Sequence, residues 1–277
     1  MSVYLKTKDH FYTQESFELQ YIPEYDMLKT NPIPQNLDDY YNHTEYISHT
    51  DQNKTFIDKI YKWIKTYSLK RKVNLINNLN CKSKNILDLG AGTGDFLKVA
   101  QSHGWSIYGV EPSKLAKEKA HKKNVTLYNK LNELPKQKFD VITLWHVLEH
   151  IPTLEQTIIE IKAKLENEGY LIIAVPNYKS YDAKYYKQYW AAYDTPRHLW
   201  HFSKQSIRIL FEDIGMKVLN IKPMLFDSFY VSLLSEKYKK GKTNYIMAFL
   251  IGLMSNIVGL FTIEYSSHIY ILKNNKN

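Results

Sequence analysis

Residues 85–96 constrain the fold more than any other part of the chain. They read NILDLGAGTGDF, an apolar run that ends in an acid and is followed by a glycine-rich turn. The apolar run predicts a buried strand, and the pattern after the glycines predicts a helix. Glycine lets a backbone turn tightly and approach a ligand that any Cβ would obstruct. This arrangement is typical of the ligand crevice of a parallel α/β sheet, but a lone turn is equally compatible with a bare strand–turn–helix unit.

The chain after residue 85 repeats an alternation of strand and helix patterns. Such an alternation predicts βαβ units and a parallel sheet. An amphipathic pattern with Asp51 as its N-cap predicts one or two helices that lead into this sheet. The expected strands are 85–89, 106–111, 125–128, 139–145, 169–175, 217–223 and 267–273, and the expected helices are 94–103, 113–123, 153–167 and 203–214.

Two regions flank or interrupt this core. Residues 1–50 are expected to be irregular, because Pro23, Pro32 and Pro34 interrupt any long element. They form an N-terminal arm or cap, which either packs on the core or closes the ligand crevice. The main domain then covers 51–277, with an aromatic insert at 178–202 and an apolar helical insert at 226–264.

Two acids near the glycine turn indicate the class of ligand. The spacing Gly90-x-Gly92-x-Gly94 departs from the GxGxxG of dinucleotide sites, and Asp95 at the helix start would repel a pyrophosphate. The same carboxylate would tolerate a cationic amine or sulfonium. Glu111 ends the next strand and suits hydrogen bonds to two ribose hydroxyls. The residues therefore favour a nucleoside with a free ribose and no phosphates, such as S-adenosylmethionine.

Four segments in order resemble the class I S-adenosylmethionine-dependent methyltransferases. Residues 87–94 are similar to the first motif of this family, and Glu111 is similar to its ribose acid. Residues 139–152 resemble the segment after the fourth strand in the subgroup of the ubiquinone O-methyltransferases, and 169–177 resemble the fifth strand and its exit. The resemblance implies an α/β, Rossmann-like, seven-stranded sheet, mostly parallel with an antiparallel last strand, and helices on both faces.

The resemblance also implies the cofactor S-adenosylmethionine, the product S-adenosylhomocysteine, and a set of donor-site residues. These surround the glycine turn and follow the second, third and fourth strands. They are Asp88, Gly90, Ala91, Gly92, Thr93, Gly94, Phe96, Glu111, Pro112, Leu131, Asn132, Trp145, His146 and Glu149.

The segment after the fourth strand is the first candidate for chemistry on the acceptor. In the resembling quinone enzymes this stretch carries acids associated with a divalent metal, but His146 stands in the place of one of them. We therefore expect no metal ion. His146 either takes part in catalysis or lines the donor pocket, with Glu149 and His150 capping the next helix. Cys81 is the single cysteine of the chain, which excludes a zinc ribbon.

The aromatic insert is the second candidate. It combines stacking faces with ionisable groups, as a pocket for a ring or a sugar requires. His198 is the expected general base, with Asp194 beside it and Arg197 as the anchor of an anionic group. The alternative is a structural corner held by an Asp–Arg pair. The expected pocket residues are Tyr189, Trp190, Tyr193, Trp200 and His201.

Residues 245–263 contain no charged side chain and follow several lysines. The segment is long enough to span a membrane, but Gly252, Asn256 and the strand that follows disfavour a span. The alternatives are a buried or dimerising helix and an interfacial helix with a basic flank. We expect a cytoplasmic protein with peripheral membrane contact or a homodimer through this segment.

The expected function is methyl transfer from S-adenosylmethionine to a small-molecule acceptor, with a hydroxyl on a ring, sugar or lipid-linked compound favoured. The alternatives are a non-catalytic protein that binds the donor, and a methyltransferase that acts on a macromolecule. Residues 145–148 read WHVL where amino-directed DNA enzymes carry a [DNS]-P-P-[YFW] motif, and the net charge of +9 is scattered over several helices. Nucleic acid is therefore not an expected partner.

Overall fold

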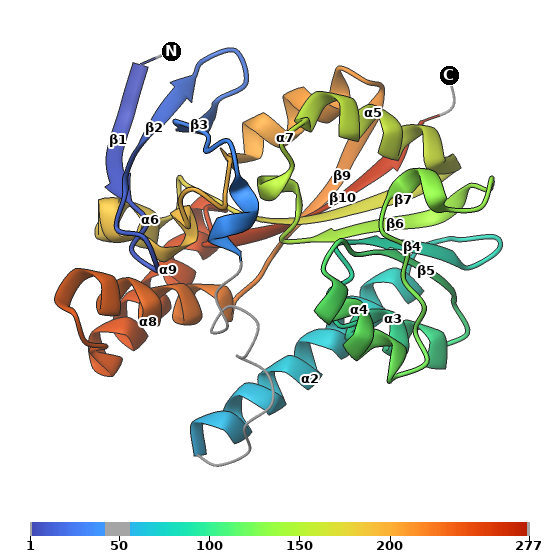
Figure 1. Cartoon of the computed structure of the whole chain (residues 1–277), viewed down its shortest axis with the longest axis horizontal. Helices are drawn as coiled ribbons and strands as arrows, with labels where there is room; N and C mark the ends of the chain where they lie inside the picture. Colours follow the sequence, from blue (N-terminus) through green and yellow to red (C-terminus); the bar gives the residue numbers. More distant parts are fainter. Residues whose placement is uncertain (1, 42–55, 276–277) are drawn as a thin grey trace.

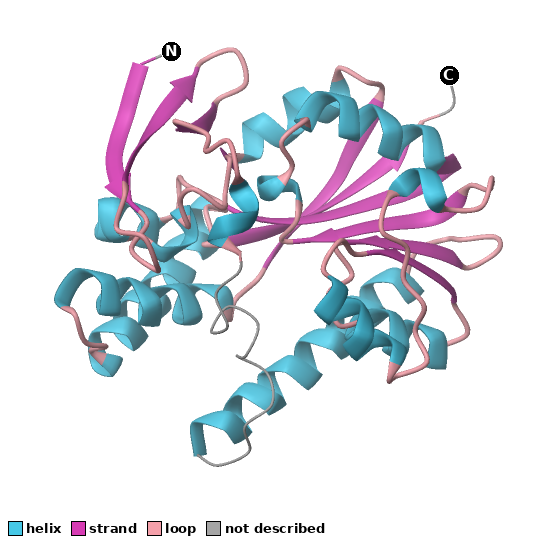
Figure 2. Cartoon of the chain, viewed as in Figure 1, coloured by secondary structure: helices cyan, strands magenta, loops and turns pink. Residues whose placement is uncertain are grey.

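The computed structural model describes residues 2–41 and 56–275, apart from the side chains of residues 38 and 56–61. It contains a large and a small β-sheet with helices packed around them (Figures 1 and 2). The large sheet has the spatial order β5 (Ser106–Val110), β4 (Asn85–Leu89), β6 (Phe139–Trp145), β7 (Leu165–Pro176), β10 (Ser267–Asn274) and β9 (Met216–Pro223).

The predicted Rossmann-like topology is confirmed in the large sheet. Strands β5, β4, β6 and β7 are parallel, and β10 runs antiparallel between β7 and β9. The expected strand at 125–128 is reduced to an isolated bridge between Val110 and Tyr128. The sheet therefore has six strands among the described residues, where seven were expected.

Helices cover both faces of the large sheet, as predicted (Figure 1). On one face, Ile158 and Leu210 pack against Leu171. On the other face, Leu97 packs near Ile172, the next residue of the same strand, because successive strand residues point to opposite sides. The first face carries α5 (Leu154–Lys164) and α7 (Lys204–Glu212), and the second carries α2 (Phe56–Asn77), α3 (Asp95–Ser102) and α4 (Lys114–His121).

The expectation of an irregular N-terminal arm was wrong for the described residues. They form an antiparallel sheet that the short strand β8 completes. Pro23 lies in the turn after the second strand and Pro32 follows the third, so the prolines separate strands without interrupting them. The sheet contains β1 (Ser2–Lys8), β2 (Ser16–Ile22), β3 (Met27–Asn31) and β8 (Trp200–His201), and Leu37–Tyr40 form a 3₁₀ turn. The predicted N-cap Asp51 lies outside the described residues.

The apolar insert before the last strand is helical, and its two long helices pack against each other. A second core joins it to the small sheet, with Leu19 and Leu28 from the sheet, Trp190 and Tyr193 from the aromatic insert, and Ile251. The helices of this region are α6 (Tyr181–Tyr186), α8 (Asp227–Lys240) and α9 (Tyr245–Thr262).

Candidate functional site

The glycine turn between β4 and α3 leaves room for a ligand. Gly90 and Gly92 have φ angles of 64° and 53°, in the left-handed region that favours glycine. A Cβ at Gly90 would lie 2.4 Å from Cγ2 of Val147, so this position packs tightly against the segment after β6. No described atom lies within 4 Å of a Cβ at Gly92, so the backbone there faces open space.

Glu111 joins the end of β5 to this turn. Its Oε2 accepts a hydrogen bond from the Gly92 N–H at 2.8 Å, and its Oε1 accepts one from the Ser113 N–H at 2.9 Å. The side chain is buried, so these bonds set the direction of the carboxylate. Each carboxylate oxygen still has a second lone pair that can accept a hydroxyl. The predicted ribose acid therefore lies directly beside the open face of the turn.

The role that the sequence suggested for Asp95 was wrong. Its carboxylate bonds Lys65 at 2.7 Å and Lys123 at 2.6 Å, and it accepts the Thr93 hydroxyl at 3.0 Å. Burial alone would raise the pKa of Asp95, but the two ammonium groups hold it below its usual value. Two lysines thus neutralise this acid, and it presents no net negative charge to a ligand.

Asp88 lies under the turn on β4 and is buried. Burial raises the pKa of Asp88. The Thr143 hydroxyl, which donates to it at 2.6 Å, and the positive charge of Lys72 oppose this increase. The Lys72 ammonium lies 4.3 Å from the ring centre of Trp145, and the Trp145 ring also forms an edge-to-face pair with Phe96. Phe96 is a core residue, and Lys72 is a site residue that the sequence did not indicate, because nothing distinguishes it from the other lysines of α2.

The remaining predicted donor residues lie along the same edge of the sheet. The Ala91 N–H donates to the carbonyl of the last residue of β5 at 3.0 Å. Glu111 N–H donates to the Tyr128 carbonyl at 2.9 Å, which brings the loop after the bridge to this edge. In that loop Leu131 is half-buried and Asn132 is exposed. Pro112 directly follows Glu111, and Gly94 is the N-cap residue before α3.

His146 lies between two carboxylates at the end of β6. Its Nδ1 is 3.3 Å from Glu149 Oε1, and its Nε2 is 3.1 Å from Asp227 Oδ2. Burial alone would lower the pKa of His146, but the two acids raise it to about 10. The ring is therefore a cation at neutral pH and cannot serve as a base. Two carboxylates and one imidazolium leave one net negative charge, which a cationic ligand tolerates.

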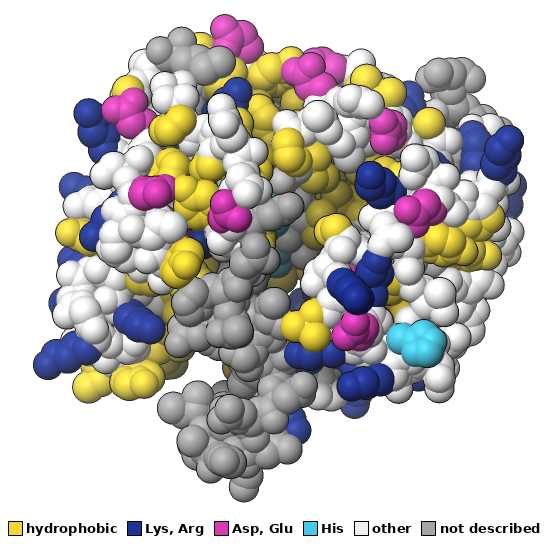
Figure 3. Space-filling model, viewed as in Figure 1, with side chains coloured by type: hydrophobic (Ala, Val, Ile, Leu, Met, Phe, Trp, Pro, Cys, Tyr) yellow, Lys and Arg dark blue, Asp and Glu magenta, His cyan; other side chains and the backbone are white. Residues whose placement is uncertain are grey.

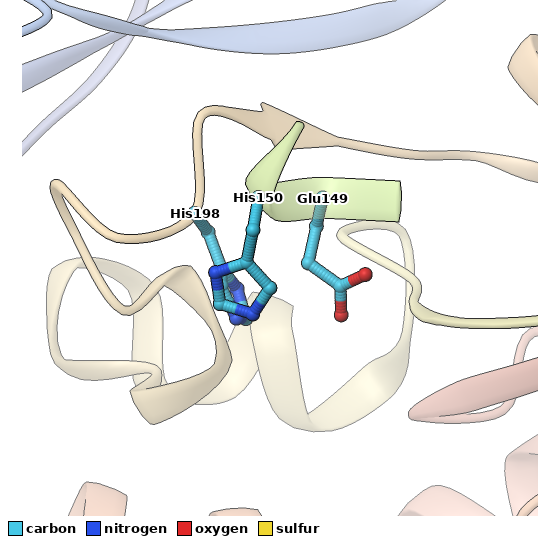
Figure 4. Close-up of side chains that lie close together, drawn as sticks. All are labelled: Glu149, His150 and His198. Atoms are coloured by element: carbon cyan, nitrogen blue, oxygen red, sulfur yellow. The ribbon is translucent and has the colours of Figure 1, made fainter. Parts of the chain in front are cut away.

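Glu149, His150 and His198 form a cluster from two separate segments (Figure 4). Glu149 is fully buried, and its Oε2 has no hydrogen-bond partner among the described residues. His150 Nδ1 lies 3.0 Å from the Arg197 carbonyl, and His198 Nδ1 lies 2.8 Å from the Ala192 carbonyl. The Ala192 carbonyl can only accept, so His198 Nδ1 donates to it, and a His198 ring without a second proton has its lone pair on Nε2.

The cluster also has a donor set that fits a divalent cation. One donor atom from each of Glu149, His150 and His198 lies within 4.8 Å of the others. Two imidazoles and a carboxylate, with the imidazoles oriented by backbone carbonyls, are common ligands of such ions. Burial, together with the neighbouring His198, lowers the pKa of His150 to about 4, so this ring is neutral at pH 7. The sequence did not indicate this set, because His198 comes from the aromatic insert.

Arg197 is buried, and the pocket that it lines together with Trp190 and Tyr193 has a volume of only about 10 Å³. Its guanidinium donates to Asp9 Oδ1 at 3.0 Å and to Asp194 Oδ1 at 2.6 Å, and its side chain is 1% exposed. The expected anchor of an anionic acceptor group is thus engaged in joining the N-terminal segment to the insert. This geometry matches the alternative of a structural corner for Arg197 and Asp194.

The aromatic residues expected to line an acceptor pocket lie mainly in the second core. Trp190, Tyr193 and His201 are buried. The Trp190 indole donates to Asp182 at 2.7 Å, and His201 Nε2 lies 3.0 Å from the Thr30 hydroxyl. Tyr189 is half-buried against the His10 ring, and the half-buried Trp200 donates to the Ile151 carbonyl at 2.7 Å. These contacts indicate packing roles, because the polar group of each indole is already bonded.

A cavity of about 580 Å³ lies away from the glycine turn. Its lining includes Asp26, Lys179, Ser203 and Arg208, and none of the predicted donor residues. Lys179 and the Ser203 hydroxyl both bond the Asp26 carboxylate there. The chemistry of the site therefore comes from the turn and the histidine cluster, and the size of this cavity does not identify it as the donor site.

Residues 61–221 match a family described as a methyltransferase domain. An uncharacterized protein of Haemophilus influenzae is 37% identical over 112 residues, which cover 34% of this chain and 43% of that protein. A ubiquinone biosynthesis O-methyltransferase of Coxiella burnetii is 27% identical over 114 residues, which cover 37% of this chain and 49% of that protein. The chain thus spans less than half the length of these relatives.

Solved structures share the fold at low sequence identity. The magnesium protoporphyrin IX methyltransferase of Synechocystis with bound S-adenosylmethionine has a TM-score of 0.53 and 16% identity, over 86% of this chain and 94% of that one. A methyltransferase described as a possible histamine N-methyltransferase of Thermotoga maritima has a TM-score of 0.52 and 19% identity, over 80% and 97%.

Proposed function

The chain belongs to the methyltransferase domain family, and from this premise we propose that it transfers a methyl group from S-adenosylmethionine to a hydroxyl group of a small molecule. The observation that carries the proposal is the contact between Glu111 and the Gly92 N–H at 2.8 Å. It places a buried carboxylate beside the open backbone of the turn. A nucleoside packed against this backbone needs such a carboxylate to accept its two ribose hydroxyls. The bound donor supplies an electrophilic methyl on a sulfonium, so the chain mainly positions the two reactants.

The charges around the turn support a cationic ligand. Asp95 with Lys65 and Lys123 carries one net positive charge. Glu111 contributes one negative charge, and the group formed by His146, Glu149 and Asp227 contributes another, so the sum of these charges is negative. The space beside Gly92 contains no described side chain and is open to a ligand. The residues that would hold the donor are thus the turn, Glu111 and the segment that starts at His146.

His198 is the proposed general base. Its Nδ1 donates to a carbonyl at 2.8 Å, which leaves the Nε2 lone pair to accept the proton of an acceptor hydroxyl. His146 is excluded from this role because the pKa of about 10 keeps it protonated. Glu149 Oε2, which has no partner among the described residues, can accept a hydrogen bond from a second donor group of the acceptor molecule.

The proposed acceptor is a small molecule with a hydroxyl on a ring, a sugar or a lipid-linked group. Two half-buried side chains, His150 and Tyr41, lie at the edge of the cluster. The Tyr41 hydroxyl is 2.9 Å from His150 Nδ1. Figure 3 shows Lys and Arg side chains spread over the visible face, with no single basic stripe. This distribution favours a small acceptor over nucleic acid.

The test is transfer of a labelled methyl group. The purified protein is incubated with labelled S-adenosylmethionine and a fractionated cell extract, and the label is measured in lipid, glycan, nucleic-acid and small-molecule fractions. We expect label in a small-molecule or lipid fraction, and loss of that label with His198→Ala. Label confined to nucleic acid or protein would contradict the proposed acceptor. Donor binding without transfer to any fraction would favour a non-catalytic role.

A further inference from the structure

Helix α9 has its large apolar side chains on the outside. Its buried residues are mostly small: Ala248, Ile251, Gly252, Ser255 and Gly259. Soluble amphipathic helices show the reverse pattern, with an apolar stripe toward the core and polar residues toward water. The exposed residues are Tyr245, Ile246, Phe249, Leu250, Leu253, Met254, Ile257, Leu260 and Phe261, with exposed fractions from 39% to 84%.

The small residues allow α9 to pack closely on the rest of the protein. A Cβ at Gly252 would lie 2.7 Å from the Phe229 ring, and one at Gly259 would lie 2.5 Å from the Tyr265 ring. Ser255 donates to the buried carboxylate of Asp182 at 2.6 Å. These contacts fix one narrow side of α9 against the rest of the protein. The apolar side of the helix is therefore held in a defined orientation, facing outward.

The fold argues that this helix lies along a surface and does not cross a membrane. Its length and mean hydropathy of 1.8 are those of a span, and only 28% of it is buried. However, α8 packs against it, and β10 begins at Ser267, close to its end, and pairs with β7 and β9. Both ends are therefore held by the same folded domain.

A basic flank complements this apolar surface. Lys237, Lys239, Lys240 and Lys242 precede α9, and all four are exposed. Lys240 pairs with Glu236 at 3.2 Å, and the Lys239 ammonium lies 4.8 Å from the Tyr185 ring. Lysines beside an apolar helix attract anionic lipid headgroups. We propose that α9 inserts its apolar surface in-plane into an anionic bilayer surface, with these lysines at the headgroups.

The proposed membrane surface is connected to the donor site. Asn256 of α9 donates to the Leu225 carbonyl at 2.9 Å, just before α8, and Asp227 at the start of α8 bonds His146. Docking would therefore hold the site near the bilayer, which fits a lipid-linked acceptor. This last step rests on the proposed function, whereas the docking itself does not.

The experiment measures sedimentation of the full chain with vesicles, without donor or acceptor. Vesicles of phosphatidylcholine with phosphatidylglycerol are compared with vesicles of phosphatidylcholine alone. We expect binding to the anionic vesicles that weakens with salt. Phe249→Glu and Phe261→Glu should each reduce partitioning into the vesicles about tenfold, because a charged side chain replaces an aromatic ring that would insert into the bilayer. Ile159→Glu on α5 is the matched control, since Ile159 and Phe249 are both 57% exposed.

Removal of positive charge provides a second, independent variant. Lys237→Gln with Lys242→Gln should lower binding to anionic vesicles about fivefold per lysine at low salt, and should not affect vesicles of phosphatidylcholine alone. The inference is overturned if the wild-type chain stays in the supernatant, or if Ile159→Glu reduces binding as much as Phe249→Glu. A dimer in light scattering that Phe261→Glu dissociates, without vesicle binding, would identify a second copy as the occupant. S-adenosylhomocysteine binding by the same variants is measured in parallel. Normal binding without attachment to vesicles overturns only the membrane inference, whereas loss of binding by the wild-type chain overturns the proposed function.

Discussion

At the scale of single residues, Glu111 has two roles, and mutation to alanine removes both. Glu111→Ala removes the acceptor of the Gly92 N–H and the proposed partner of the ribose, so we expect donor affinity to fall about 10–100-fold. Calorimetric titration with S-adenosylhomocysteine measures the change. Glu166→Ala, at an exposed acid near the start of β7 and therefore at the other edge of the sheet, is the control and should have no effect. Unchanged affinity in a folded Glu111→Ala protein would mean that the ribose assignment is wrong.

Two nearby histidines should titrate at opposite ends of the pH scale. Asp227 and Glu149 raise the pKa of His146 to about 10, and burial lowers that of His150 to about 4. The stability contributed by His146 is complete below its unfolded pKa of about 6.5 and is lost as pH rises through about 10. The stability contributed by the neutral His150 ring is complete above about pH 6.5 and is lost as pH falls from about 6.5 toward 4. Both rings should be observed by NMR; two midpoints near 6.5 would contradict the geometry.

Mutation of His198 should affect chemistry more than binding. We expect His198→Ala to lower turnover about 10²–10⁴-fold, the usual contribution of a general base, with little change in donor affinity. His201→Ala is not a suitable control because His201 is buried against Thr30. His121→Ala, at the exposed end of α4, is the appropriate one. Full turnover by His198→Ala would assign the base to another group.

Residue roles could be predicted where they follow from chain position, but not where they depend on distant partners. Glu111 lies at the end of a strand, and its place beside the turn follows from the parallel sheet. Asp95 and Arg197 were assigned to ligands because each carries a charge near an expected site. Their partners, Lys65, Lys123 and Asp9, come from segments whose approach no local pattern reveals.

At the scale of elements, Asp182 connects three segments of the second core. It accepts hydrogen bonds from Trp190 at 2.7 Å, Ser255 at 2.6 Å and Ser266 at 2.7 Å, and it is fully buried. Asp182→Ala leaves three buried donors unsatisfied, so we expect it to lower the free energy of unfolding by about 3 kcal/mol or more. Urea denaturation measures this, with the exposed Asp39→Ala as control. A loss similar to that of the control would show that the three segments do not depend on this carboxylate.

Elements with a strong local period were predictable, and those completed by remote pairing were not. The boundaries of β4 and β6 match the predicted strands, because both are mostly apolar and are buried on two faces. The small sheet was missed because Pro23 and Pro32 were taken to interrupt elements, whereas they lie between and after strands, and because its fourth strand, β8, comes from the aromatic insert far along the chain. The same pairing explains why the aromatic residues of that insert form a core and do not line a pocket.

At the scale of the whole molecule, the donor turn belongs to the large sheet, whereas His198 comes from the insert that the small sheet holds. The Arg197–Asp9 pair and the second core connect the two parts. The fold class could be predicted from alternating patterns along the chain. The histidine cluster could not, since it depends on how the insert returns to the end of β6 (Figure 4).

The central claim is that the turn binds an S-adenosyl nucleoside that carries no phosphate. Calorimetric titration of the full chain with S-adenosylhomocysteine and, separately, with NAD tests it most directly. The account predicts that S-adenosylhomocysteine binds at one site per chain and that NAD does not bind, because the turn lacks the dinucleotide spacing. Binding of NAD, or no binding of S-adenosylhomocysteine by the folded chain, would contradict it.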